Sequence, residues 1–119
     1  MITFREIIFD VNRSSVIEPD DWLAGDWVAW VGSYDEFGRN EAGTCQVLIS
    51  KDWTPSVKGG DTGYAGIVEL PNGIINMVSY GHWDQKFSNN WQGGVTTDLC
   101  YIKQASFNLR DILKENNLI

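Results

Sequence analysis

The sequence has few residues that bind metal ions. Its single histidine, His82, and its two cysteines, Cys45 and Cys100, are isolated from one another along the chain. A zinc site needs three or four such ligands at short spacings, so we expect neither a metal site nor a cofactor. Each cysteine lies in an apolar, strand-like run. A free buried thiol is the default there, and a disulfide between adjacent strands stays open.

Positive charge is also scarce. Nine lysine and arginine residues stand against 16 aspartate and glutamate residues, which gives a formal net charge of −7. No basic cluster is present to replace the counterions of a phosphate backbone, so we expect no nucleic-acid binding. An acidic surface of this kind favours solubility or attracts a basic protein partner.

Long apolar runs are missing as well. No stretch approaches the roughly 20 residues that a membrane-spanning helix needs. Residues 1–6 also lack the basic start and apolar run of a signal peptide. We therefore expect no membrane association. We also expect that the chain is either a cytoplasmic protein or a piece of a larger protein. The length of 119 residues fits a single domain, 1–119.

Aromatic and β-forming residues are plentiful by contrast. The six tryptophans suit the core of a sheet protein and also the walls of sugar or peptide sites. Runs of β-forming residues predict about six strands. We expect them at 4–10, 25–31, 44–50, 63–70, 74–83 and 101–108. The turn at Pro71-Asn72-Gly73 supplies the positive φ angles that join the fourth and fifth strands as a hairpin.

The segments between these strands are rich in polar residues, glycine and proline, and we expect loops at 12–21, 33–43, 51–63 and 84–98. Asn108 is placed to cap a short C-terminal helix over 109–115, with Leu109, Ile112 and Leu113 on one side. Because the connections are too short for βαβ crossovers, the pattern predicts an all-β fold of antiparallel sheets.

Three segments occur in the order seen in sialidase-like proteins with bacterial neuraminidase repeats. Residues 43–53 are similar to the family's strand and Ser-x-Asp-x-Gly-x-x-Trp turn, although here Trp53 follows Asp52 directly. Residues 63–73 are similar to its Gly-Tyr hairpin, and residues 101–109 to its closing strand. The chain thus resembles the C-terminal part of a sialidase-like β-propeller, which implies one to two blades.

The resemblance implies a carbohydrate site. The family's tyrosine nucleophile falls on Tyr64, since a neutral phenol can approach the anomeric carbon of an anionic sugar. One of the arginines that grip the sugar carboxylate falls on Arg39. Further candidate sugar contacts are Tyr80, His82, Trp83 and Trp91. Simpler roles stay open: Tyr64 as a strand-edge aromatic, Arg39 as a solvated turn residue, and His82 as a hydrogen-bonded surface histidine.

A complete hydrolase is not expected. A six-bladed propeller needs about 24 strands, so the chain is too short for a whole sialidase; any surviving activity would be that of a glycoside hydrolase. We expect a non-catalytic binding domain with a groove for a sialic-acid-type sugar. Its exposed sheet edges predict a homo-oligomer.

Two alternatives remain. The chain fits a small acidic inhibitor of the immunity-protein type that neutralises a basic partner; this hypothesis predicts an acidic patch with tryptophan nearby. The patch would contain Asp20, Asp21, Asp26, Asp35 and Glu36. It also fits a sheet domain whose ancestry no longer reports its role. The carbohydrate hypothesis predicts instead that Arg39 and Tyr64 converge on one concave site.

Overall fold

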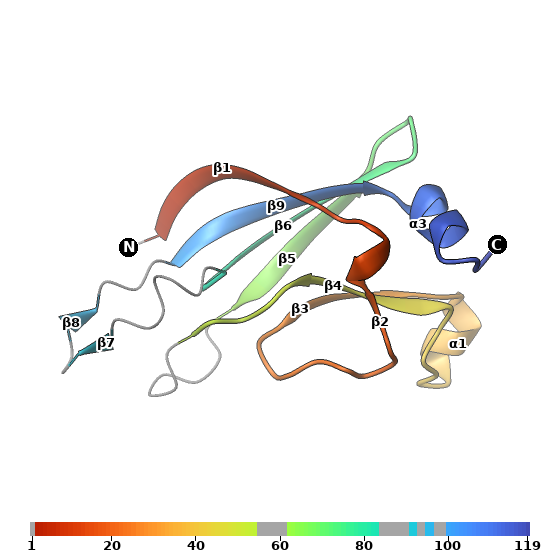
Figure 1. Ribbon diagram of the computed structural model, residues 1–119, viewed down its shortest axis with the longest axis horizontal. Helices are drawn as coiled ribbons and strands as arrows, with labels where there is room; N and C mark the ends of the chain where they lie inside the picture. The colour runs from red at the N-terminus through yellow and green to blue at the C-terminus, as the bar shows by residue number, and fades with distance from the viewer. Residues whose placement is uncertain (1, 55–61, 84–90, 93–94, 97–99) are drawn as a thin grey trace.

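Two β-sheets lie one above the other in the computed structural model, which describes residues 2–54, 62–83, 91–92, 95–96 and 100–119 (Figure 1). The larger sheet has the strand order β1-β9-β6-β5. Its strands are β1 (Ile2–Asp10), β9 (Cys100–Asn108), β6 (Ile74–Gly81) and β5 (Gly63–Glu69).

The smaller sheet has the order β2-β4-β3, and its strands are β2 (Val16–Ile17), β4 (Cys45–Ser50) and β3 (Trp27–Val31). A separate short hairpin pairs β7 (Trp91–Gln92) with β8 (Val95–Thr96). The helical elements are the 3₁₀ turn η1 (Arg13–Ser15) and the helices α1 (Tyr34–Gly38) and α3 (Leu109–Glu115).

The mostly β character that the sequence predicts is confirmed, and each of the six expected strands is present. The expected loops hold more structure than predicted: η1 and β2 lie within 12–21, α1 lies within 33–43, and the β7–β8 hairpin lies within 84–98. Most of the expected loop at 51–63 and the remainder of 84–98 lie outside the described residues.

The expectation of purely antiparallel sheets is wrong at one pair. β1 pairs with β9 in parallel, from Ile2 opposite Cys100 to Asp10 opposite Ser106. Parallel strands need a long crossover, and here almost the whole chain lies between them. The prediction considered only the short connections between neighbouring strands. The resemblance to propeller blades is not confirmed by this mixed sheet.

β9 and α3 form where the sequence predicts them. Residues along β9 alternate between buried and half-buried, as expected for a strand with one face on the core. The Asn108 side chain accepts a hydrogen bond from the backbone N–H of Asp111 and so caps α3. Ile112 of this helix is buried, with Leu109 and Leu113 packed against the core.

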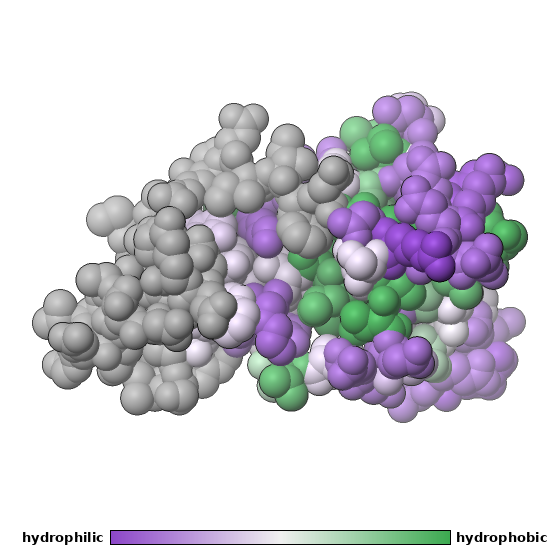
Figure 2. All heavy atoms as spheres, viewed as in Figure 1, coloured by the Kyte–Doolittle hydropathy of each residue, from purple (hydrophilic) through white to green (hydrophobic). Residues whose placement is uncertain are grey.

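One hydrophobic core joins the two sheets. β4 contributes Val47 and Ile49, both fully buried, and β9 contributes Ala105 and Phe107 from the opposite sheet. In Figure 2 hydrophobic side chains show between hydrophilic ones near the middle of the view, where the sheets face each other. The core therefore fixes the smaller sheet against the larger one.

Cys45 lies in this core as a free thiol, and burial raises its pKa. Cys45 therefore forms no disulfide with Cys100, the alternative that the sequence left open. Of the helices in the described residues, none has the length and apolar character needed to cross a membrane.

Candidate functional site

Tyr64 and Tyr80 lie together at the open end of the β5–β6 hairpin. Their ring centroids are 6.5 Å apart, and Tyr64 is 94% exposed. The pairing register shifts between Gly63 and Gly66, and Tyr64 has a φ of 51°, which bulky residues rarely adopt. This irregularity sets Tyr64 on the sheet surface, so two of the residues predicted for a sugar site do meet.

His82 and Trp83 lie in the interior instead. His82 is 2% exposed, and its Nδ1 lies 3.3 Å from the Thr54 hydroxyl. The Trp83 ring packs against Trp27 with centroids 5.7 Å apart, and its indole N–H donates to the Ser79 carbonyl. The expectation of a surface histidine at position 82 is therefore wrong, and Trp83 presents no exposed ring to a sugar, because both side chains complete the core.

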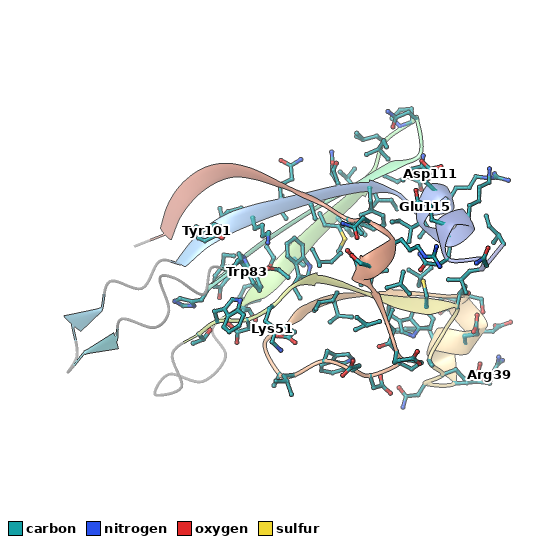
Figure 3. The ribbon with its side chains drawn as sticks, in the orientation of Figure 1. Arg39, Lys51, Trp83, Tyr101, Asp111 and Glu115 are labelled. Atoms are coloured by element: carbon teal, nitrogen blue, oxygen red, sulfur yellow. The ribbon has the colours of Figure 1, made fainter. Side chains whose placement is uncertain are left out.

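Arg39 lies apart from the other predicted site residues. It follows α1, and Figure 3 shows it near one end of the long axis, away from Trp83, which lies nearer the middle of the view. Its Nε donates to Glu41 Oε1 at 2.8 Å and its Nη2 to Oε2 at 3.3 Å. Two cavities among the described residues are lined by neither Arg39 nor Tyr64. The side chain of Trp91 lies outside the described residues.

A different cavity, of about 590 Å³, lies over the smaller sheet beside α1. We call it the acidic pocket, because its walls combine carboxylates and aromatic rings. Its lining residues are Asp20, Trp22, Asp26, Val28, Trp30, Phe37, Asn40, Glu41, Ala42 and Gln46.

The aromatic walls come from three separate segments. Trp30 of β3 meets Phe37 of α1 edge to face, with ring centroids 5.7 Å apart, and its indole N–H donates to the Glu41 carbonyl at 3.0 Å. Trp22 comes from the loop before β3. Trp22 is 46% exposed and Phe37 69%, so both rings leave apolar area at the pocket open to contact.

Asp20 is held at the pocket by Gln46 of β4. The Gln46 side chain accepts the Asp20 backbone N–H at 2.9 Å and donates to Asp20 Oδ1 at 3.3 Å. Gln46 also donates to the Ala42 carbonyl at 3.4 Å. Asp20 has a φ of 62°, a conformation that aspartate tolerates better than most residues. The buried Gln46 amide thus connects Asp20 and Ala42, which both line the pocket, to strand β4.

Asp26 forms the nearly fully buried carboxylate of the pocket. It accepts the backbone N–H groups of Asp52 at 2.9 Å and Leu23 at 3.0 Å, and the Lys51 ammonium at 3.2 Å. Burial raises the pKa of Asp26, but these hydrogen bonds and the Lys51 charge outweigh it, so its pKa lies below the ordinary value. Asp26 therefore stays ionised at neutral pH and shapes the loop that carries Trp22.

Glu36 has a structural role at the start of α1. Ser33 and Glu36 form a capping box, in which the Ser33 backbone N–H donates to the Glu36 carboxylate and the Glu36 backbone N–H donates to the Ser33 hydroxyl. These bonds lower the pKa of Glu36. Within the described part of the chain, no three His, Cys, Asp or Glu side chains are placed to hold a metal ion.

The acidic patch expected from the sequence is only partly recovered. Asp20 and Asp26 line the pocket, whereas Asp21, Asp35 and Glu36 do not, and Glu41 joins it instead. The aromatic walls at Trp22, Trp30 and Phe37 were missed. A signal for Phe37 was present, because Ser33 and Glu36 have capping-box spacing, which predicts a helix start just before Phe37.

Comparison of the chain with protein-family models, with curated proteins and with solved structures finds no match. The resemblance to sialidase-like proteins therefore stays a prediction.

Proposed function

We propose that this protein is a non-catalytic binding module that captures a basic protein partner by admitting one of its cationic side chains into the acidic pocket. The observation that carries the proposal is the meeting of three aromatic rings and three carboxylates in one cavity. Aromatic faces attract cations, and the attraction strengthens when the cation is desolvated.

The overall charge supports the same kind of partner. A net charge of −7 steers a basic protein toward this surface and accelerates encounter. Exposed Trp22 and Phe37 are the residue types that anchor protein interfaces when buried by a partner. This role agrees with the inhibitor-type alternative drawn from the sequence.

The proposal is tested with a fluorescent peptide of alternating arginine and lysine, titrated at physiological salt and followed by anisotropy. Trp22→Ala should weaken binding about five-fold or more, the equivalent of ~1 kcal/mol for a lost cation–π contact. Leu23→Ala is the matched control, since Leu23 is a large exposed apolar residue in the same loop that does not line the pocket.

General attraction to an acidic protein must be separated from binding in the pocket. Asp20→Asn and Asp21→Asn remove the same charge from neighbouring residues, but only Asp20 lines the cavity. Asparagine also keeps the acceptor for Gln46 and tolerates the same φ. A clear loss for Asp20→Asn alone supports the pocket. Equal losses of peptide affinity in both variants would show that net charge alone explains the binding, and would contradict the proposal.

A carbohydrate-binding surface is a second candidate, favoured by the exposed Tyr64 beside Tyr80. The expected convergence of Arg39 and Tyr64 on one concave site is not part of it, because neither residue lines the cavities described above. Aromatic pairs of this type stack on sugar rings. Thermal-shift measurements with sialic acid and neutral sugars test it. Arg39 lies beside α1, away from the strands β5 and β6 that carry this tyrosine pair (Figure 3), so the test substitutes the tyrosines. A sialic-acid shift abolished by Tyr64→Ala or Tyr80→Ala would support it, and no shift with any sugar would remove it.

A further inference from the structure

We infer that the acidic pocket selects arginine over lysine, with Glu41 as the carboxylate that pairs with the incoming guanidinium and Arg39 as its intramolecular competitor. This inference rests on the proposed function and adds the chemical identity of the cation. It also assigns a role to the Arg39–Glu41 ion pair, of which Glu41 lines the pocket.

The backbone of Glu41 is fixed on both sides of the residue. Its N–H donates to the Glu36 carbonyl at 3.0 Å, and its carbonyl accepts the Trp30 indole N–H at 3.0 Å. The side chain therefore starts from a defined point on the pocket rim. A carboxylate anchored in this way needs less ordering when it binds a charged group.

Arg39 shows how that carboxylate receives a guanidinium. Two N–H groups of Arg39 reach the two oxygens of Glu41, at 2.8 and 3.3 Å, in the paired arrangement that only arginine can make. Both side chains are largely exposed, so the pair adds little to stability. An arginine from a partner can take the place of Arg39 at small cost to the fold.

The aromatic walls favour the same group. Trp30 and Phe37 meet at an interplanar angle of 68°, and Trp22 adds a third ring to the lining. A planar, weakly hydrated guanidinium stacks on such faces while still donating to a carboxylate at its edge. A lysine ammonium is a compact, strongly hydrated charge without a plane, so it makes only part of these contacts.

The test compares labelled hexa-arginine and hexa-lysine peptides by anisotropy at physiological salt. Wild-type protein should bind the arginine peptide about five-fold more tightly, and Glu41→Gln should remove most of that preference. Arg39→Ala should tighten binding of the arginine peptide about three-fold relative to Arg13→Ala. Arg13 is the matched control because it is exposed, removes the same charge and does not line the pocket.

The outcomes separate the inference from the proposed function. If neither peptide binds in a way that depends on Trp22, the proposed function fails. If both peptides bind equally and Trp22→Ala weakens both, the proposed function stands and arginine selection is overturned. If Arg39→Ala behaves like Arg13→Ala, or weakens binding, Arg39 is no competitor. Melting curves of each variant verify that these surface changes leave the fold intact.

Discussion

Two groups of aromatic side chains in the described residues differ in their surroundings, those of the acidic pocket over the smaller sheet and those of the β5–β6 hairpin of the larger one. In the pocket, Trp30 packs against Phe37 and its N–H is held by a backbone carbonyl. On the hairpin, Tyr64 stands at an open sheet edge beside Tyr80. Exposure alone therefore does not distinguish the two groups: Trp22, Trp30 and Phe37 line a cavity, whereas the more exposed Tyr64 does not line it.

Charge separates the two regions further. The pocket gathers the carboxylates of Asp20, Asp26 and Glu41, whereas β5 carries one charged residue, Glu69, at its end. The acidic pocket matches the cationic side chain proposed above, and the β5 edge matches the strand of a second copy that carries little charge. The two regions should therefore respond differently to substitution, to acid and to a second copy of the chain.

The largest difference is expected in packing. Ile49 of β4 is fully buried between the sheets, whereas Ile67 of β5 is 68% exposed. Ile49→Ala should lower the free energy of unfolding by about 2–5 kcal/mol, and Ile67→Ala should change it by no more than about 0.5 kcal/mol. Denaturant unfolding followed by tryptophan fluorescence measures both. Similar losses would mean that β5 is as integral to the core as β4.

Glycine substitutions probe the same contrast through the backbone. Gly43, just before β4, has a φ of 77°, and an added Cβ would lie 2.4 Å from the Val31 carbonyl oxygen. Gly66 of β5 has an ordinary φ, and its Cβ would lie 3.3 Å from a Val78 methyl. Gly43→Ala should cost about 2–3 kcal/mol, and Gly66→Ala about 0.5 kcal/mol or less. Thermal melts rank the two variants, and the reverse order would contradict this account.

Acid should weaken the pocket loop first. The folded-state pKa of Asp26 is lowered, so its stabilising effect is complete above the unfolded pKa near 4 and is lost as pH falls through the folded value. Asp26→Asn should cost about 1–2 kcal/mol at neutral pH and flatten the loss of stability as the pH falls below the unfolded pKa of about 4.

The matched control for that experiment is Asp21→Asn, which removes an exposed carboxylate from the same loop. Unfolding free energies measured across the acid range should show the wild-type slope for this control. A wild-type slope in Asp26→Asn as well would show that other carboxylates carry the acid sensitivity.

Much of the fold could be predicted because the signals are local. Alternation along β9 and the Asn108 cap depend on neighbouring residues, and both are present as expected. The turn at Pro71-Asn72-Gly73 does join β5 to β6, but only Gly73 has a positive φ, of 83°, so the positive φ expected at Asn72 is wrong. The parallel pairing of β1 with β9 joins strands from the two ends of the chain. No local pattern encodes this pairing. Short connections between neighbouring strands predicted antiparallel pairs, and the same prediction was wrongly applied to β1 and β9.

The site was harder to predict because burial is a property of the whole fold. Trp22 and Trp83 both flank polar loops, yet Trp22 lines the acidic pocket and Trp83 packs in the core. The sequence indicated that acidic residues and tryptophan would lie near each other, and Asp20 and Asp26 do so. It could not indicate which ring would face solvent, since that depends on how the two sheets stack.

The smallest effect on the folded chain is expected at the edge strand β5, where the prediction of a homo-oligomer is tested. Ile67 pairs with buried Met77 in the sheet but is itself 68% exposed, and β5 lacks the lysine or proline that usually protects an edge. Antiparallel pairing of two β5 strands about their middle would place Glu69 opposite uncharged residues, so the second copy adds no like-charge contact there.

Sedimentation over a wide range of concentration should therefore show reversible dimers, and Ile67→Lys should abolish them while leaving the melting temperature nearly unchanged. Val78→Lys adds the same charge to the exposed face of the neighbouring strand β6, away from the edge, and should leave dimers in place. Equal loss in both variants would attribute association to the sheet face, and a monomer at every concentration would leave the acidic pocket as the only region expected to bind a partner.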